Sequence, residues 1–277
     1  MKHLKKIFKD TAHPKNMANI NTYANKITKA AGIMFIGLVF SRLFTYFYVI
    51  LLARLGSSTY GLLTLGFTVI TFLSTLTLMG LKPALLRFIS FYKGKNDERR
   101  VKGTILTSMK ISIPLSIIVA ILVFIFAKDI ANLFHNPDLT LLLRMMAVLI
   151  PIRGFNRIFM NSITAFQKIK QVILIDHIIR NVVKLGLTFI LILMGMTILG
   201  PVIAFMITIL VVFVLSFYTL EKKVFPIIKT KVKAVYNRKE LLLFAVPLLF
   251  SDFLVDIAKW ADTWFIGAFR TTSEVGI

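Results

Sequence analysis

The sequence contains no cysteine and few acidic residues. Without cysteine the chain can form no disulfide, no thiolate metal site and no cysteine nucleophile, so its redox chemistry does not indicate a compartment. Its 12 Asp and Glu residues stand against 34 Lys and Arg residues, a formal net charge of +22. Such an excess indicates either nucleic acid or an anionic surface as a partner, and the distribution of the charges decides between them.

Motifs that carry enzyme chemistry are also missing. The sequence has no phosphate-binding Gly-x4-Gly-Lys-Ser/Thr loop, no His-Glu-x-x-His, no Gly-x-Ser-x-Gly and no pair of carboxylates in a long loop. The connections that carry few basic residues are too short to hold a catalytic domain. We therefore predict a protein that is not an enzyme and that needs neither a metal nor a cofactor.

Long apolar stretches make up most of the chain. It is 57% hydrophobic with a mean hydropathy of +0.81, whereas soluble domains are about 45 to 50% apolar. A helix needs roughly 20 apolar residues to cross a bilayer. Seven stretches meet this requirement: 30–53, 61–80, 105–127, 140–162, 171–194, 197–219 and 241–267. Because no alternating pattern competes with them, the predicted fold is all-α, a polytopic bundle of about seven transmembrane helices in the cell membrane.

The basic residues fall in every second connection between these stretches. Twenty-five of the 34 lie before residue 30 or within 82–102, 153–170 and 222–239. By the positive-inside rule these segments face the cytoplasm, so the N terminus is predicted to lie inside. The positive charge is then explained by membrane topology, and no nucleic-acid partner is expected.

A weak internal repeat places Gly61 over Gly276, at an offset of 215 residues, and pairs Ala53 with Ala268. Six helices separate the two copies, so both run in the same direction and the repeat is a parallel one. We therefore expect a first six-helix lobe followed by the first helix of a parallel second lobe, in a longer protein. A complete seven-helix protein with a chance similarity is the alternative.

Four segments follow from this organisation. Residues 1–29 are a basic cytoplasmic N-terminal segment and residues 30–219 the first six-helix lobe. Residues 220–240 form a basic amphipathic cytoplasmic linker, which suits contact with anionic lipid headgroups. Residues 241–277 contain the first helix of the truncated second lobe.

Ionisable residues inside the apolar stretches are the candidate site residues, because each costs about 2.5 to 3.5 kcal/mol near the centre of a bilayer. Spacings of three and four residues place such groups on one face of their helix. Faces of this kind, turned inward, would line a hydrated and mostly cationic cavity open to the cytoplasm. We predict that a phosphate-like substrate group is bound by Arg42, Lys184, Arg180, Lys259, Arg153 and Arg157.

The acidic residues of the same stretches have a different predicted role. Charge balance, or the coupling of transport to an ion, is assigned to Asp252, Asp256 and Asp176. An alternative for Arg42 is a structural ion pair with Asp252 or Asp256, because buried charges usually have partners. The sequence leaves both readings of Arg42 open.

Several segments resemble a known family. They are GLVFSRLFTYFYVILLARLGSSTYGLLTLG, MGLKPALLRFISFYKGKND, LFHNPDLTLLLRMMAVLIPI and VPLLFSDF. They are similar to segments of the polysaccharide-export and oligosaccharide flippases, whose exporter superfamily also contains the multidrug and toxin extrusion antiporters. The resemblance implies two six-helix lobes that open alternately to the two sides of the membrane. It also implies that the Ser41-Arg42 pair belongs to a cationic cavity.

The residues and the resemblance together predict a flippase that moves a lipid-linked oligosaccharide across the cell membrane for surface polysaccharide biosynthesis. Expected partners are the polyisoprenyl-linked oligosaccharide and membrane lipids, with H⁺ or Na⁺ as candidate coupling ions. A polysaccharide polymerase and glycosyltransferases are candidate protein partners. The alternatives are an ion-coupled multidrug exporter of the same superfamily, a polytopic transferase acting on lipid-linked sugars, and a scaffold for the synthesis machinery.

Overall fold

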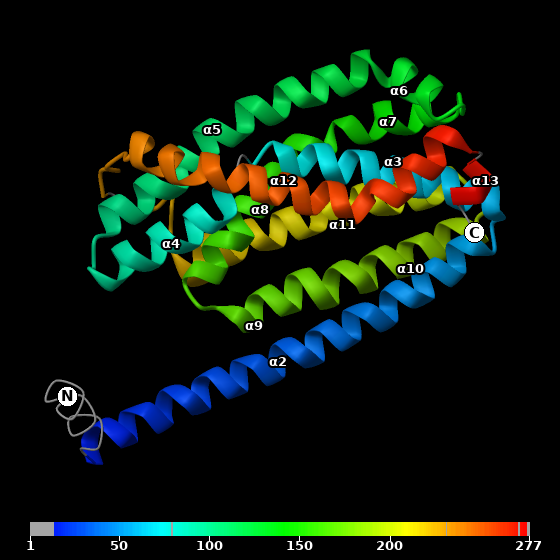
Figure 1. Ribbon diagram of the computed structural model, residues 1–277. Helices are drawn as coiled ribbons and strands as arrows, with labels where there is room; N and C mark the ends of the chain where they lie inside the picture. Colours follow the sequence, from blue (N-terminus) through cyan, green and yellow to red (C-terminus); the bar gives the residue numbers. More distant parts are fainter. Residues whose placement is uncertain (1–13, 79, 231, 271, 276–277) are drawn as a thin grey trace, which may run out of the picture.

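The computed structural model describes residues 14–275 except 79, 231 and 271, and gives the backbone alone for 14–27, 29, 30, 256, 272 and 273. Within these residues the chain is a bundle of helices with no strand (Figure 1). The α-helices are α2 (Pro14–Ala53), α3 (Ser57–Leu76), α4 (Leu81–Gly94), α5 (Glu98–Ile125), α6 (Ala127–Leu133), α7 (Leu139–Ala147), α8 (Leu149–Ala165), α9 (Ile169–Val172), α10 (Arg180–Leu193), α11 (Leu199–Thr219), α12 (Arg238–Phe269) and α13 (Thr272–Val275). Two π-helical segments are η1 (Ile173–Ile179) and η2 (Leu220–Val224). The predicted all-α class is confirmed.

Four helices are long and apolar enough to cross a membrane, and two bent pairs raise the number to as many as six. The four are Ala31–Ala53, Ser57–Leu76, Glu98–Ile125 and Leu199–Val224, and the pairs are α7 with α8 and the two halves of α12. The predicted fifth stretch, 171–194, is helical but is split between α9, η1 and α10, so no α-helical piece there reaches 18 residues. The structure therefore has four to six candidate spans where about seven were predicted, and the predicted fifth stretch is an interrupted helix.

Proline and glycine explain where the helices break. Pro151 has no N–H to donate to Ala147, the last residue of α7, and its ring crowds that carbonyl, so α7 and α8 meet at 48°. Gly80, the residue directly before α4, has the left-handed conformation, with φ +68°, and the chain turns there from α3 into α4. Both changes of direction therefore have a local cause in the sequence.

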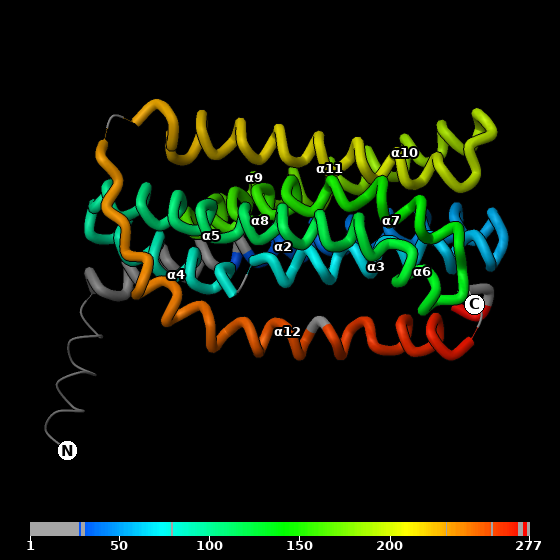
Figure 2. The backbone as a smooth tube through the Cα atoms, turned by 90° about the horizontal axis from the view of Figure 1, so that it is seen from above, coloured from blue at the N-terminus to red at the C-terminus, as the bar shows by residue number. Residues whose placement is uncertain are grey.

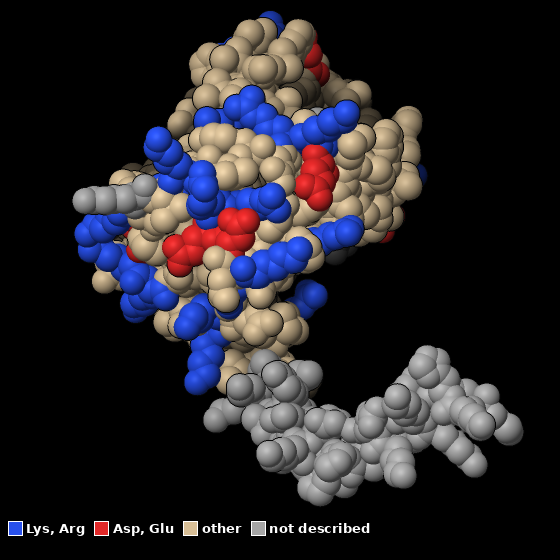
Figure 3. All heavy atoms as spheres, turned by 90° about the vertical axis from the view of Figure 1, so that its left-hand side faces the viewer, with Lys and Arg blue, Asp and Glu red and all other residues tan. Residues whose placement is uncertain are grey.

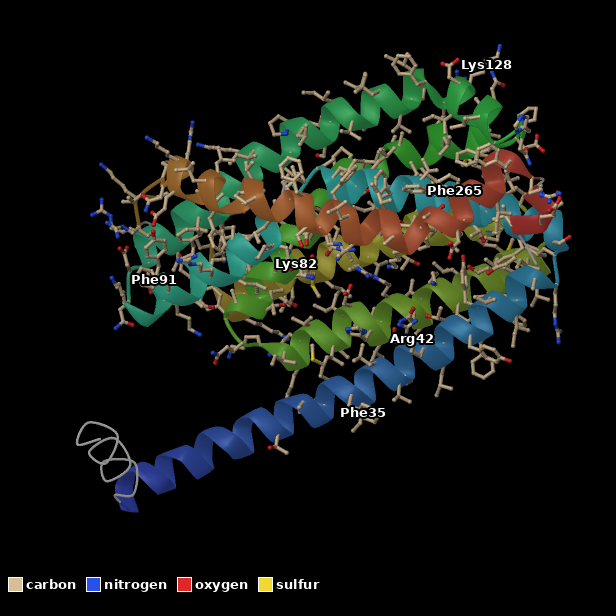
Figure 4. The ribbon with its side chains drawn as sticks, viewed as in Figure 1. Phe35, Arg42, Lys82, Phe91, Lys128 and Phe265 are labelled. Carbon is tan, nitrogen blue, oxygen red and sulfur yellow. The ribbon has the colours of Figure 1, made fainter. Side chains whose placement is uncertain are left out.

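The basic connections gather at one end of the bundle, on the left in Figure 1, where α4 turns into α5, α8 turns into α9 and α11 leads to α12. Figure 3 looks onto this end, and Lys and Arg side chains outnumber Asp and Glu there. Exposed basic residues of these connections are Lys93, Lys95, Arg99, Arg100, Lys168, Lys222, Lys223, Lys229, Lys233, Arg238 and Lys239. Most of the predicted basic segments therefore lie at this end, but Lys82 lies midway along the bundle (Figure 4) and Arg153 and Arg157 lie within α8. The cytoplasmic location of this end stays a prediction.

Small residues allow the helices to approach closely. Ser108, Ser112 and Ser116 follow one another at intervals of four on α5 and are fully buried. A Cβ on Gly154 of α8 would lie 3.6 Å from the hydroxyls of both Ser112 and Ser116. Small residues at contacts of this kind are typical of helix packing in membranes, where backbones come together without bulky side chains between them.

The described part of the linker before α12 is helical only at its start, in η2. After η2 it runs over the end of α5 as turns and extended chain, and the buried carboxylate of Glu221 accepts hydrogen bonds from the backbone N–H groups of Ile227, Ile228 and Lys229 at 2.7 to 3.2 Å. Carboxylates bound to several backbone donors form strong hydrogen bonds. The segment is therefore fixed by backbone contacts, and its place on anionic headgroups remains a prediction.

Helices α12 and α11 lie on different sides of the bundle. Figure 2 shows α12 along one edge and α11 along the opposite edge. Helix α12 packs on α3 and α4, where the ring of Phe72 is 4.5 Å from the ring of Trp264 and 5.9 Å from that of Phe253. Helix α2 packs chiefly on α9, η1 and α10. The second half of the internal repeat ends at Gly276, which lies outside the described residues, so the repeat itself stays a prediction.

Candidate functional site

A cavity of about 230 Å³ lies between helices α3, α8, α10 and α11. We call it the central cavity, and its lining consists of Thr71, Arg153, Asn156, Arg157, Arg180, Lys184, Phe205, Thr208 and Ile209. Four of the six cations predicted to bind substrate are therefore brought together. They come from two of the predicted membrane stretches, with Arg153 and Arg157 in 140–162 and Arg180 and Lys184 in 171–194.

The central cavity lies halfway along the helices, between two apolar clusters. The cluster nearer the basic end contains Ile158 of α8 and Val212 of α11, whereas the other contains Ile150 of α8 and Val202 of α11. The cationic lining residues of α8 fall between these positions. The packing therefore encloses the polar groups at mid-height, where the bilayer would otherwise exclude them.

Arg153 is held in the cavity wall by an aromatic ring and not by a carboxylate. Its guanidinium carbon lies 5.6 Å from the ring centroid of Phe205. Its Nε is buried and has no hydrogen-bond partner among the described residues, and the same holds for the Oδ1 atom of Asn156, a residue that is 4% exposed. Buried polar atoms are normally paired, so these two atoms are available to hydrogen-bond a group that enters the cavity.

Lys184 reaches the cavity from α10 and rests on an aromatic ring of α2. Its ammonium nitrogen lies 4.0 Å from the ring centroid of Tyr48, a cation–π contact. No described carboxylate pairs with it. The hydroxyls of Tyr48 and Thr188 are buried beside this contact without a hydrogen-bond partner of good geometry in the described structure. The ammonium group is positioned by packing, and its charge is not neutralised.

Arg180 differs from these two cations because it has an acidic partner. It forms an ion pair with Asp176, one turn earlier in the interrupted fifth helix. Asp176 lies in the π-helical segment η1, whose wider turn changes the direction of the side chains relative to an α-helix. The predicted charge-balancing role of Asp176 is consistent with this pair, and π-helical turns inside α-helices occur often at functional sites.

The remaining predicted residues lie outside the lining of the central cavity. Arg42 is exposed near the middle of the apolar part of α2 (Figure 4) and forms no ion pair with a described carboxylate. Phe35, two turns earlier on the same side of the helix, is 68% exposed. Lys259 is exposed on α12 with its ammonium nitrogen 4.7 Å from the ring centroid of Trp260. The structure thus leaves two predicted cations on open helix faces.

Asp252, a predicted acidic residue of α12, is also outside the described lining of the central cavity. Asp252 is half-buried on α12 and makes no described ion pair, and the side chain of Asp256 lies outside the described residues. The alternative of an ion pair between Arg42 and Asp252 is therefore not observed. Their part in charge balance or coupling stays a prediction.

Sequence reasoning missed some lining residues. Asn156 stands three positions after Arg153, so the spacing that grouped the arginines could have identified it. Thr68 and Thr71 stand three positions apart on α3, yet Thr71 lines the cavity, whereas Thr68 is buried with its hydroxyl bonded to a backbone carbonyl. Nothing in the sequence pointed to Thr208, which lies in a stretch without charged residues.

The arrangement can bind an anion but offers little acid or base. Four cations line one small cavity; Arg180 forms an ion pair with Asp176, whereas no described ion pair involves Arg153 or Lys184. Among the described residues, no three His, Asp or Glu side chains gather as a metal ion would require. The chemistry that the described lining supports is recognition of negative charge.

Comparison with known proteins gives a family and a fold. Residues 27–277 match the profile of the family described as polysaccharide biosynthesis protein. The fold is similar to a solved inward-facing conformation of a multidrug resistance MATE family transporter of the MOP superfamily, with a TM-score of 0.67 at 17% identity, over 85% of this chain. The chain covers 56% of the length of that transporter. No individual curated protein has a matching sequence.

Proposed function

The chain belongs to the polysaccharide biosynthesis protein family, and from this premise we propose that it forms part of a flippase for a lipid-linked oligosaccharide. The cargo is a glycan attached through phosphate to a polyisoprenyl lipid. It crosses the cell membrane by alternating access and supplies surface polysaccharide biosynthesis. No covalent bond is made or broken in this step.

The unpaired cations of the central cavity carry the proposal. Arg153 and Lys184 are held by aromatic rings, without a described carboxylate partner. A buried charge without a counter-charge is costly, so an anion entering the cavity is stabilised there. Phosphate fits because it carries concentrated negative charge and accepts two parallel hydrogen bonds from one guanidinium.

The size of the cavity assigns different places to the parts of the cargo. About 230 Å³ accommodates a phosphate or pyrophosphate with a few water molecules, but not an oligosaccharide. The sugars would extend along the exposed sides of α2 and α12, where Arg42 and Lys259 provide further positive charge. The hydrocarbon chain would stay on the lipid-facing side of the bundle, because its transfer into a hydrated cavity would expose apolar surface to water.

Charge also separates this proposal from the alternative of a drug exporter. A cavity lined by Arg153, Arg157, Arg180 and Lys184 repels organic cations. Coupling to H⁺ or Na⁺ would then fall to carboxylates such as Asp252 and Asp256, away from the phosphate. A polymerase and glycosyltransferases are the protein partners that this role requires before and after transport.

Deletion of the gene should remove the surface polysaccharide and leave its lipid-linked precursor exposed only on the cytoplasmic leaflet. The precursor would be detected with a glycan-binding lectin applied to intact spheroplasts and to inverted membrane vesicles. We expect labelling in the vesicles alone, because synthesis continues while transport stops.

The same strain complemented with the intact gene serves as the control. An unchanged surface glycan together with increased drug sensitivity would favour the exporter. Loss of the precursor itself would favour a transferase, and in either case the flippase proposal fails.

A further inference from the structure

A second hollow, apolar and larger than the central cavity, lies between α2 and α10. It has a volume of about 490 Å³, and we call it the α2–α10 groove. Its walls are Phe44, Phe47, Ile50, Leu51 and Arg54 from α2, with Val182, Leu185, Gly186 and Phe189 from α10. All of these side chains are apolar except Arg54, which stands at the end of the row.

The groove exists because α2 and η1–α10 touch along a narrow seam. A Cβ on Gly37 would overlap the side chain of Ile173, so the helices are in close contact there. One step further along, the Nδ2 of Asn181 donates a hydrogen bond of 2.9 Å to the hydroxyl of Ser41. Beyond this point the floor opens at Gly186, where an added Cβ would meet no atom within 4 Å.

The length and position of the groove match one half of a bilayer. From Phe44 to Arg54 the helix rises about 15 Å, half of a hydrocarbon core of about 30 Å. The groove ends at Arg54, at the end of the bundle opposite the basic connections (Figure 1). The Arg54 side chain is exposed and has no hydrogen-bond or ion-pair partner among the described residues.

The groove and the central cavity lie on different faces of α10. Lys184 lines the cavity, whereas the next residue, Leu185, lines the groove. The ring of Tyr48, on which Lys184 rests, fills the seam between them. An anionic group and an apolar chain can therefore be bound on the two sides of one helix.

We propose that the α2–α10 groove binds the polyisoprenyl chain of the cargo lipid in the leaflet opposite the basic end, with the lipid phosphate on Arg54. The inference rests on the proposed function, because it identifies the chain as that of the transported lipid. Three phenylalanine rings beside a glycine form an apolar wall against which a hydrocarbon chain can pack. Arg54 supplies the charge that a phosphate requires at the end of that chain.

Photolabelling of the full-length protein in vesicles tests this inference. One vesicle set contains a photoreactive polyisoprenyl phosphate and the other a photoreactive phosphatidylglycerol at the same concentration. We expect the polyisoprenyl probe to label peptides covering residues 44–54 and 182–189, and unlabelled polyisoprenyl phosphate to compete with it.

Two variants locate the site within the groove. Gly186→Leu fills the groove without a clash and should lower labelling about tenfold, whereas Gly32→Leu, at another glycine of open surroundings on α2, should leave it unchanged. Arg54→Ala should lower labelling roughly tenfold, and Arg54→Lys should retain most of it.

Equal labelling by the phosphatidylglycerol probe would overturn the inference, because the groove would then hold an ordinary acyl chain. Unchanged labelling of Gly186→Leu would also overturn it. Labelling of the groove does not require transport. If the groove is labelled but the cavity variants show no export defect, the proposed function alone fails. Blocked export in cavity variants together with no labelling of the groove would reject the groove alone.

Discussion

The substitution Lys184→Met in the full-length protein is expected to lower the rate of surface polysaccharide export between about tenfold and about hundredfold. Methionine keeps an unbranched apolar stem against the ring of Tyr48 but removes the charge. A hydrogen bond to a charged group contributes about 1.5 to 3 kcal/mol, and each 1.4 kcal/mol is a factor of ten. Export would be measured as the rate at which labelled sugar appears on the cell surface, normalised to the amount of protein in the membrane.

Two matched variants interpret the result. Lys184→Arg keeps the charge at nearly the same position and should retain most of the export. Arg144→Met removes a cation from an exposed position of α7, where it lies 5.5 Å from the ring of Phe124, and should have little effect. Normal export by well-expressed Lys184→Met would remove the central cavity from the mechanism.

The substitution Gly80→Ala is expected to destabilise the packing of α12 by more than about 3 kcal/mol. Gly80 has φ +68°, a conformation that costs other residues about 1 to 2 kcal/mol. An added Cβ would also overlap the backbone carbonyl oxygen of Ala245 on α12, and backbone cannot move aside as a flexible side chain can. The measurement is the thermal unfolding midpoint of the purified protein in detergent.

Gly195→Ala is the control for Gly80→Ala. Gly195 also has positive φ, +87°, but an added Cβ there would meet no atom within 4 Å. It should therefore show the backbone cost alone, and the difference between the two variants measures the contact with α12. Equal midpoints for both variants would mean that α12 does not lie against this corner.

The fold was predictable from the sequence wherever one physical constraint dominated. Only helices satisfy their own backbone hydrogen bonds in lipid, so apolar stretches of about 20 residues identified the elements. The alternation of Lys and Arg identified the connections from α4 to α5, from α8 to α9 and from α11 to α12, which the structure places at one end. Lys82, Arg153 and Arg157 of the same predicted segments lie further along the bundle. Both features depend on composition over many residues and not on any single contact.

The irregular parts were not predictable, because they depend on tertiary contacts. The fifth stretch contains a π-helical segment whose turn no local pattern announces. The linker is rich in lysine, as a segment on anionic headgroups would be. Its conformation is instead fixed by the carboxylate of Glu221, which accepts hydrogen bonds from the backbone N–H groups of Ile227 and Lys229. In both cases a specific interaction overrides the propensity of the segment.

The candidate site was predictable in part for a similar reason. A charge inside an apolar stretch is conspicuous, and Arg153, Arg157, Arg180 and Lys184 do come together. Which side of α2 packs against α10 could not be predicted in the same way, because α2 has polar residues on more than one side. Ser41, and not Arg42, makes the contact with α10.

The central claim is that the buried cations face water and an anionic group, and one thiol measurement tests it most directly. The chain has no cysteine, so Lys184→Cys introduces a single reactive group into it, and only a hydrated thiolate reacts rapidly with a charged, membrane-impermeant reagent. We predict rapid labelling that polyisoprenyl pyrophosphate slows, and no labelling of Leu193→Cys, at a position that is 71% exposed on the apolar surface. A thiol that stays unreactive at position 184, or one whose labelling the lipid pyrophosphate does not change, would contradict the account.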